Sequence, residues 1–332
     1  MTIEDFLAEW HNESPFVKVQ TSGSTGAPKQ ILVEKRRMLN SARITCDFLG
    51  LREGDTALLC MSLDYIAGKM MVVRALERGL RLVVQEPGGH PMRSLEFKLY
   101  TLNSTLSFAA MVPMQVWNSL QTAEERDRLR QIRHLIIGGG AIDEAMAREL
   151  KDFPNAVWST YGMTETLSHI ALRRLNGPEA SEWYTPFPSV RVRLSDENCL
   201  VIDAPEVCAE TLVTNDIAEL SPDGTRFRIL GRKDNTICSG GIKIQAEEVE
   251  RQLKGALVAP FLISKCQDVK FGESVVLLTE GDVEGARIAC ERLLPKYHRP
   301  RHYLHVEHIP LTATGKPARK QAEILCQELL KT

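Results

Sequence analysis

The feature that most restricts the fold of this chain is a regular alternation of short apolar runs with amphipathic segments over residues 30–137. Apolar runs of the length of buried strands lie at residues 58–61, 80–84 and 132–137, and segments with helical spacing precede or separate them. Strands that alternate with helices are typical of βαβ units. The pattern therefore predicts an α/β fold with a mostly parallel sheet.

The later part of the chain has a different pattern. Residues 183–230 are rich in strand-like segments, whereas residues 245–253 and 283–294 have the spacing of amphipathic helices. With 332 residues the chain is long enough for two domains that each bury a core. We expect a large N-terminal α/β domain with a β-rich subdomain at residues 1–233, and a small α+β domain at residues 234–332.

Composition excludes several classes of protein. Apolar residues make up 43% and charged residues 25% of the chain, which is ordinary for a globular protein, and the net charge of −2 offers no basic field for nucleic acid or a membrane surface. No apolar run approaches the length of a membrane-spanning helix. The eight cysteines are scattered without a C-x-x-C pair. We expect reduced thiols, no structural metal site and a cytoplasmic location.

A cluster of hydroxyl groups, glycines and one lysine, TSGSTGAPK, occupies residues 21–29. Glycines let backbone N–H groups approach a ligand closely, and the hydroxyls and the ammonium group suit a polyphosphate. The spacing differs from the G-x-x-x-x-G-K-[ST] loop, because Lys29 follows Gly26 by three residues and precedes Gln30. A plain Ser/Gly turn has the same composition, so these residues alone leave both interpretations open.

Two further segments suggest ligand chemistry. The apolar run at residues 132–137 leads into three glycines at 138–140, and open α/β sheets bind ligands at the carboxyl ends of their strands. A tight turn without a ligand is the alternative for these glycines. The segment YGMTE at residues 161–165 combines an aromatic ring for a base, a hydroxyl for a phosphate and a carboxylate for Mg²⁺.

These segments resemble, in order, motifs of the acyl- and aryl-adenylate-forming enzymes, which include acyl-CoA synthetases, luciferases and the adenylation domains of peptide synthetases. Three later segments extend the resemblance: TNDIA at 214–218, GRKDNTICSGGIKI at 231–244 and TATGKPAR at 312–319. Asn215 stands where the family usually has glycine, a mild departure because asparagine tolerates left-handed backbone. The matched motifs are spread over residues 21–319, nearly the whole chain.

The resemblance implies a role for each matched residue. Lys316 would contact the acyl carboxylate and the phosphate during adenylation, Thr164 the α-phosphate, and Glu165 the Mg²⁺ ion. Tyr161 would pack on adenine, and Asp216 would accept hydrogen bonds from the ribose hydroxyls. The residues expected to bind ATP or AMP are Thr21, Ser22, Gly23, Ser24, Thr25, Gly26, Lys29, Gly139, Gly140, Tyr161, Gly162, Asp216 and Arg232.

The resemblance also implies a hinge. Asp234 would be the pivot on which the C-terminal domain turns between the two half-reactions, and Gly240 and Gly241 would border the tunnel for the pantetheine arm of coenzyme A. Only 20 residues precede the glycine-hydroxyl loop, so we expect an N-terminal domain that is shortened at its start. A second subunit covering the flank left by the missing lobe would make the protein a homodimer.

The acid substrate is indicated by a region that departs from the family pattern. The segment LDYIAG at residues 63–68 has Tyr65 where the family has histidine, and Tyr65, Gly68 and Gly138 are candidates for the acyl pocket. Arg74 follows Gly68 by six residues, an interval that resembles o-succinylbenzoate–CoA ligases of menaquinone synthesis. Their substrate is an aromatic dicarboxylic acid, whose second carboxylate suits a nearby cation. The alternative is a surface salt-bridge role for Arg74.

The favoured hypothesis is an ATP-dependent acid–CoA ligase that uses Mg²⁺ and coenzyme A, with o-succinylbenzoate as the acid. A second hypothesis is an enzyme that loads another small or aromatic acid onto coenzyme A or onto the phosphopantetheine of a carrier protein. The third is an inactive homologue that only binds a partner. Retention of Lys29, Glu165, Asp216, Arg232 and Lys316 argues against the third, because a protein without catalysis has no chemical need for the set.

Overall fold

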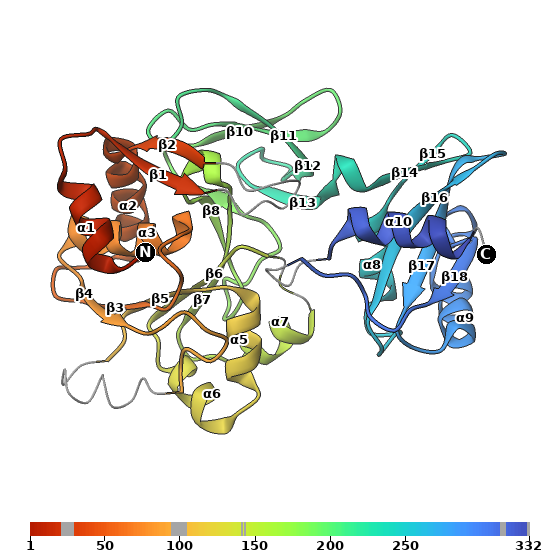
Figure 1. Cartoon of the computed structure of the whole chain (residues 1–332), viewed down its shortest axis with the longest axis horizontal. Helices are drawn as coiled ribbons and strands as arrows, with labels where there is room; N and C mark the ends of the chain where they lie inside the picture. The colour runs from red at the N-terminus through yellow and green to blue at the C-terminus, as the bar shows by residue number, and fades with distance from the viewer. Residues whose placement is uncertain (21–29, 94–104, 141, 143, 313–316, 331–332) are drawn as a thin grey trace. The chain divides into compact units, whose positions relative to one another are not determined.

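The computed structural model describes residues 1–20, 30–93, 105–140, 142, 144–312 and 317–330 (Figure 1). The chain divides into two compact units whose boundaries interleave along the β-rich segment. The boundary predicted at residue 234 therefore stays a prediction. The first unit comprises Met1–Arg193, Ile202–Leu212 and Ser221–Phe227, and the second comprises Leu194–Val201, Val213–Leu220 and Arg228–Thr332.

A seven-stranded sheet forms the centre of the first unit, with the order β4-β3-β5-β6-β7-β8-β9. The strands β4, β3, β5, β6 and β7 pair in parallel, whereas β8 and β9 are added in antiparallel orientation. The predicted α/β class with a mostly parallel sheet is confirmed. The strands are β3 (Thr56–Leu59), β4 (Arg81–Val84), β5 (Phe108–Met111), β6 (His134–Ile137), β7 (Ala156–Gly162), β8 (His169–Arg174) and β9 (Thr185–Pro186).

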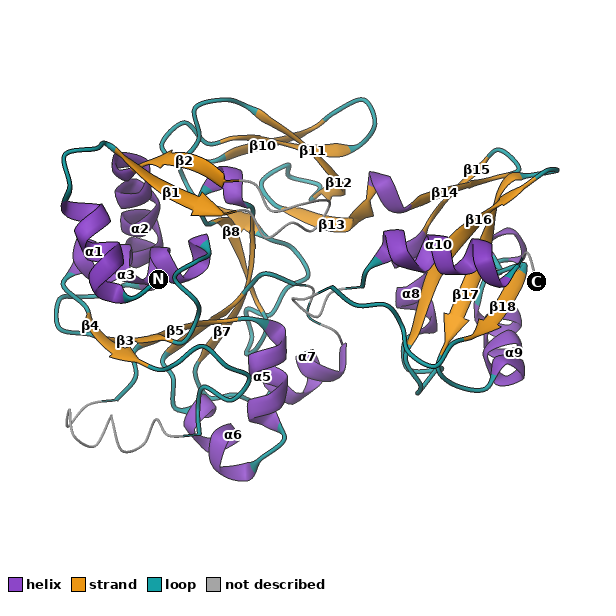
Figure 2. Cartoon of the chain, in the orientation of Figure 1, coloured by secondary structure: helices purple, strands orange, loops and turns teal. Residues whose placement is uncertain are grey.

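Figure 2 shows the helices of this unit in purple, and two of them have ends with a clear local cause. The second helix ends at Gly50, which adopts the left-handed conformation and donates its N–H to Asp47 O and Cys46 O. Helix α5 begins at Pro113, whose missing N–H costs nothing at the first helical position. The described helices are α1 (Ile3–His11), α2 (Lys35–Leu49), α3 (Ile66–Arg78), α5 (Pro113–Leu120), α6 (Ala123–Arg130) and α7 (Glu144–Leu150).

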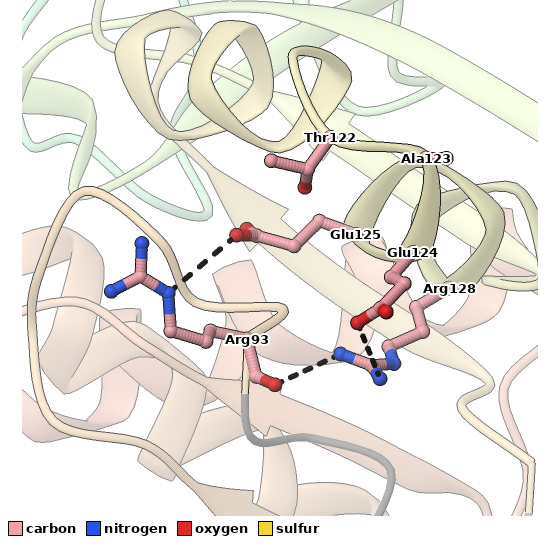
Figure 3. Close-up of a pocket in the computed structure, with 6 residues that line it drawn as sticks. All are labelled: Arg93, Thr122, Ala123, Glu124, Glu125 and Arg128. Carbon is pink, nitrogen blue, oxygen red and sulfur yellow. Dashed lines mark hydrogen bonds and ion pairs between the residues drawn. The ribbon is translucent and has the colours of Figure 1, made fainter.

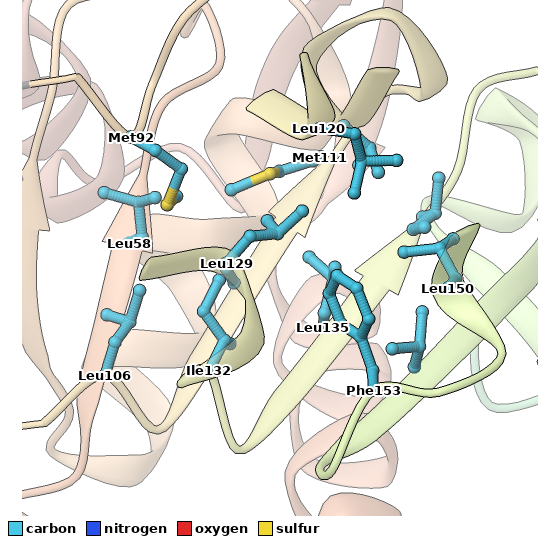
Figure 4. Packing of buried hydrophobic residues seen from close by; sticks show 14 of the residues in the cluster. Leu58, Met92, Leu106, Met111, Leu120, Leu129, Ile132, Leu135, Leu150 and Phe153 are labelled. Atoms are coloured by element: carbon cyan, nitrogen blue, oxygen red, sulfur yellow. The ribbon is translucent and has the colours of Figure 1, made fainter. Parts of the chain in front are cut away.

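One buried cluster joins the central strands to helices α5, α6 and α7 (Figure 4). Leu58, Met111 and Leu135 point into it from the sheet, and Leu120 and Leu150 point into it from the helices. Removing each such side chain from water contributes about 1.5–3 kcal/mol to folding. The cluster therefore fixes the strands whose carboxyl ends carry the predicted site residues.

Two smaller β-structures accompany the main sheet. The strands β1 (Phe16–Gln20) and β2 (Gln30–Glu34) pair antiparallel, with Gln20 opposite Gln30. A four-stranded sheet with the order β10-β11-β12-β13 follows the main sheet in the chain, as the β-rich segment predicts. Its strands are β10 (Arg191–Leu194), β11 (Cys199–Asp203), β12 (Leu212–Leu220) and β13 (Phe227–Arg232).

The second unit has an α+β core of helices on both faces of a five-stranded sheet. Successive residues of β17 alternate between two buried clusters: Val275 and Leu277 pack with α8 and α9, and Val276 and Leu278 pack with α10. None of the described helices is both long and apolar enough to cross a bilayer. The elements are β14 (Thr236–Ser239), β15 (Ile242–Gln245), α8 (Ala246–Leu253), β16 (Phe261–Asp268), β17 (Gly272–Thr279), α9 (Val283–Leu293), β18 (His302–His305) and α10 (Arg319–Leu329).

Candidate active site

The end of β7 turns sharply and presents two of the predicted catalytic side chains. Residues Thr164–Thr166 form a short 3₁₀ helix, which is closed when Thr166 Oγ1 accepts a hydrogen bond of 3.0 Å from Met163 N. Thr166 is buried, so it serves as the anchor, while Glu165 is exposed and Thr164 is half-buried. The turn therefore holds a hydroxyl and a carboxylate at the carboxyl edge of the sheet, where α/β folds bind ligands.

The glycines after β6 lie beside this turn because β6 and β7 are paired in parallel, with Ile137 opposite Ser159. A Cβ on Gly138 would lie 2.3 Å from Thr160 Oγ1, so only glycine fits against β7 at this position. Gly139 has a φ of +78°, a conformation that side chains disfavour. The structure thus brings together the glycine run at 138–140 and the segment at 161–165, which are distant in the sequence.

Tyr161 contributes a flat surface at the same edge. Its ring meets the ring of Phe227 edge-on, with centroids 5.1 Å apart, and lies 5.8 Å from the ring of Tyr184. Tyr184 in turn stacks on Phe227 and forms a 2.8 Å hydrogen bond with Ser159 Oγ. These contacts fix the orientation of the half-buried Tyr161 ring, which suits the proposed packing on a nucleotide base.

Arg74 occupies a position that the sequence did not predict. It is 2% exposed, so its interpretation as a surface salt-bridge residue of the helix is wrong. Its guanidinium donates to Ser168 Oγ at 2.6 Å and lies 6.0 Å from the centre of the Phe108 ring. Burial lowers the pKa of Arg74 to about 10, which still leaves it charged at neutral pH. Within the described residues Arg74 forms no ion pair with a carboxylate, and its buried Nε has no hydrogen-bond partner.

Tyr65 and Gly68 lie at the start of the same helix, and Gly68 has a structural explanation. Tyr65 precedes α3 and is 42% exposed. A Cβ on Gly68 would lie 2.2 Å from Ser62 O, so the close approach of the preceding backbone requires glycine there. Their assignment to an acyl pocket stays a prediction.

Asp216 and Arg232, predicted to hold the ribose, lie together in the second unit. Arg232 NH1 is 3.3 Å from Asp216 Oδ1, and Arg232 NH2 is 2.7 Å from Asp234 Oδ2. Burial alone would lower the pKa of Arg232, but the hydrogen bond to Asp234 and the charge of Asp216 outweigh it, and the pKa is raised. Asn215 Nδ2 lies 3.4 Å from Asp234 Oδ2, so the residue that replaces the usual glycine contacts the predicted pivot.

Gly240 and Gly241 form the two-residue turn between β14 and β15. Ser239 is paired with Ile242 across this hairpin, and the two glycines have φ values of +58° and +83°. Two successive positive φ angles are the signature of a tight hairpin turn that glycine adopts without strain. Gly240 N also donates to Phe271 O at 2.8 Å. The turn accounts for both glycines, and their contact with a pantetheine arm remains a prediction.

The sequence matches the profile of a family described as AMP-binding enzyme over residues 5–210, which is more than half of the chain. The chain belongs to the AMP-binding enzyme family. A solved relative, described as an acyl-CoA synthetase (AMP-forming)/AMP-acid ligase II-like protein from Dyadobacter fermentans DSM 18053, is 32% identical. The match covers 97% of this chain and 92% of that chain, with a TM-score of 0.65.

More distant members of the AMP-binding enzyme family agree with this fold. A 2-succinylbenzoate–CoA ligase from Bacillus thuringiensis subsp. konkukian (strain 97-27) is 24% identical over 94% of this chain and 70% of its own length. The o-succinylbenzoate coenzyme A synthetase from Bacillus subtilis, solved with ATP and magnesium ion, is 22% identical with a TM-score of 0.74 over 92% of this chain and 69% of that chain. The prediction of an AMP-forming acyl-CoA synthetase is thus confirmed at the level of the family.

Some predicted family residues lie outside the described part of the chain. They are Thr21, Ser22, Gly23, Ser24, Thr25, Gly26, Lys29 and Lys316. Within the described part, no group of three or more His, Cys, Asp or Glu side chains could hold a metal ion by itself. Glu165 alone still fits Mg²⁺, because this ion keeps several waters and binds one or two carboxylates together with substrate phosphates.

Sequence reasoning missed Ser168, which contacts Arg74, and also His169 and Thr45, which continue the hydrogen bonds from Ser168. Ser168 and His169 follow the segment at 161–165 within four residues, so their proximity to that motif was the available signal. Thr45 belongs to α2, 124 residues before His169, and nothing in the sequence relates the two.

A hollow of about 410 Å³ is lined by residues outside the family motifs (Figure 3). Its charges are paired among themselves: Arg93 Nε lies 3.9 Å from Glu125 Oε1, and Arg128 NH2 lies 3.8 Å from Glu124 Oε2. The hollow contains none of the predicted site residues. It is lined by Arg93, Thr122, Ala123, Glu124, Glu125 and Arg128.

Proposed function

We propose that this chain is an ATP-dependent acid–CoA ligase whose acid carries a second carboxylate, with o-succinylbenzoate as the favoured substrate. The observation that carries the proposal is the buried guanidinium of Arg74, which forms no ion pair with a described carboxylate. The names of the relatives from Bacillus thuringiensis and Bacillus subtilis support the same acid.

Electrostatics explains why Arg74 points to an acid with two carboxylates. A buried charge is costly unless it is paired and hydrogen-bonded. Arg74 has one good acceptor, Ser168 Oγ, and a weak one, Met71 Sδ at 3.7 Å from NH1. A carboxylate of the substrate would supply the missing negative charge and accept from the free Nε–H. An acid with only the reacting carboxylate would leave the guanidinium without an ion-pair partner. The site would therefore discriminate between acids with one carboxylate and acids with two.

In the first half-reaction the reacting carboxylate attacks the α-phosphate of ATP, and pyrophosphate leaves. Thr164 donates a hydrogen bond from its hydroxyl group to the α-phosphate, and Lys316 places an ammonium group where negative charge develops. Glu165 holds Mg²⁺, which neutralises charge on the phosphates when bound. Asp216 and Arg232 orient the ribose, and Tyr161 holds the base, so that the reacting atoms are aligned.

In the second half-reaction the thiol of coenzyme A attacks the acyl carbon of the adenylate, and AMP leaves. We propose that the C-terminal part of the chain turns about Asp234 between the two steps. The contacts of Asp234 with Arg232 and Asn215 make it the residue whose hydrogen bonds such a turn would exchange. The rotation would replace Lys316 by Gly240 and Gly241 next to the thiol.

The test compares pyrophosphate release with o-succinylbenzoate and with benzoate, which lacks the second carboxylate, using wild type, Arg74→Met and Arg78→Met. Arg78 lies one turn further along α3, bonds Asp47 at 2.6 Å, and serves as the matched control. We expect Arg74→Met to lower kcat/KM for o-succinylbenzoate by about 10- to 100-fold, because a hydrogen bond to a charged group contributes about 1.5–3 kcal/mol. Activity with benzoate should change little.

The products and the acceptor test the rest of the proposal. AMP and the acyl-CoA thioester should form together when coenzyme A is present. Release of ADP, or equal effects of Arg74→Met on both acids, would contradict the proposed reaction or the proposed substrate class. If the thioester forms only on a phosphopantetheinylated carrier protein, that protein and not coenzyme A is the acceptor.

A further inference from the structure

A continuous row of polar groups, buried except for the half-buried Ser168, extends from Arg74 to α2. Arg74 NH2 lies 2.6 Å from Ser168 Oγ, and Ser168 Oγ lies 3.2 Å from His169 Nδ1. His169 Nε2 lies 3.1 Å from Thr45 Oγ1, and Thr45 Oγ1 lies 3.0 Å from Ser41 O. Three separate elements, α3, the start of β8 and α2, therefore meet in one chain of hydrogen bonds.

With Thr45 donating to Ser41 O and Arg74 donating to Ser168, one set of hydrogen-bond directions fits the whole row. Ser41 O is a carbonyl and can only accept, so Thr45 donates its hydroxyl proton to it. Thr45 Oγ1 must then accept from His169 Nε2–H, which leaves His169 Nδ1 without a proton and able to accept from Ser168. The Ser168 oxygen is consequently left to accept from Arg74, which has only donors.

The surroundings keep His169 in this neutral form. Burial, and then the positive charge of Arg74, hold the pKa of His169 well below its ordinary value. From α2, Cys46 interacts with Arg74, and burial raises the pKa of Cys46 to about 11, so this thiol is uncharged. Phe187 contacts the His169 ring at a centroid distance of 5.6 Å and carries no charge. Arg74 is the charged group from α3.

We propose that Ser168 and His169 are positioning residues for the substrate's second carboxylate, and this rests on the proposed function of Arg74. A neutral His169 accepts a hydrogen bond from the Ser168 hydroxyl group and so orients the Ser168 oxygen toward Arg74. The guanidinium is then held by one NH2 donor, with Nε–H left for the carboxylate. Specificity for a dicarboxylic acid thereby depends on side chains that never touch the substrate.

Two substitutions of His169 separate the halves of the row. His169→Asn places an amide oxygen near the position of Nδ1, where it can still accept from Ser168. His169→Gln places an amide N–H near the position of Nε2, which keeps the bond to Thr45 and loses the acceptor for Ser168. If His169 has only a structural role, His169→Gln should retain as much activity with the dicarboxylic acid as His169→Asn, or more. If His169 positions Ser168, His169→Asn should retain more. Ser168→Thr and Ser168→Ala form a second such pair.

The readout is KM and kcat for o-succinylbenzoate and for benzoate in each variant. We expect Ser168→Ala and His169→Gln to raise KM for o-succinylbenzoate by about tenfold, the effect of weakening one charge-assisted hydrogen bond, with little change in KM for benzoate or ATP. Ser168→Thr and His169→Asn should stay close to wild type. Equal effects on both acids, or no effect of Ser168→Ala and His169→Gln, would overturn the proposal.

Two comparisons keep the proposal distinguishable from the proposed function. If Arg74→Met affects both acids equally, the proposed substrate class fails. If Arg74→Met is selective but the Ser168 and His169 variants are not, only the positioning role fails. Independently of folding in any variant, ¹H–¹⁵N NMR spectra of the histidine-labelled wild type should show His169 protonated on Nε2. Protonation on Nδ1 would contradict the row.

Discussion

The ion pair between Arg319 and Glu250 gives the sharpest stability prediction, because it joins three elements of the second unit. Arg319 begins α10, and its NH1 and NH2 groups lie 3.1 and 2.8 Å from the two carboxylate oxygens of Glu250 in α8. Arg319 NH1 also donates to Ile263 O in β16 at 3.1 Å, and Ile263 N donates to Glu250 at 2.9 Å. A double-mutant cycle with Arg319→Met and Glu250→Gln measures the coupling.

The expected coupling follows from geometry and burial. The side chains are 23% and 15% exposed, so the pair lies between an exposed ion pair and a buried one. Exposed pairs contribute about 0–1 kcal/mol, and breaking a buried pair costs about 3–5 kcal/mol. Because the contact is bidentate, we expect each single substitution to lower the free energy of opening of this unit by about 2–3 kcal/mol. The expected coupling energy between the two substitutions is about 1.5–2 kcal/mol.

The assay is hydrogen exchange of the amides of β16, residues 261–268, followed by mass spectrometry. It reports the free energy of opening of this unit alone, which matters because a chain with two units need not unfold in one step. Arg287 and Glu284 on α9 are the matched control, since both are exposed and should show no measurable coupling. Simple additivity of Arg319→Met and Glu250→Gln would refute the reasoning.

Two further outcomes follow from the first unit. Gly162→Ala places a Cβ 2.3 Å from Ser168 O, so it should destabilise the fold by about 1–3 kcal/mol in urea denaturation and lower activity, whereas Gly88→Ala, with only Glu86 O at 3.9 Å, should do neither. The pKa of His169 is depressed in the fold, so below about pH 6.5 the unfolded chain takes up the proton first and the free energy of unfolding falls by about 1.4 kcal/mol per pH unit. Between about pH 7.5 and 5.5, the free energy of unfolding should fall less in His169→Asn than in the wild type. An equal fall in both proteins would contradict a buried neutral histidine.

The sequence by itself determined the features that depend on local pattern and spacing. Alternating apolar runs predicted a mostly parallel sheet, since backbone hydrogen bonding and side-chain periodicity are local properties. The glycines at 138–140 were correctly expected at the end of a strand, which is β6. The ordered motifs predicted the family, because catalytic chemistry constrains residue types at short spacings.

Only the tertiary structure decided the environment of Arg74. From the sequence, an arginine in an amphipathic helix is indistinguishable from a surface residue, because burial depends on which face other elements cover. Ser168 lies 94 residues from Arg74 and Thr45 lies 124 residues from His169. The pairing of β7 with β8 and the packing of α2 on α3 bring them together. Such long-range contacts leave no mark in local spacing, and they decide that Arg74 is buried without a described carboxylate as its partner.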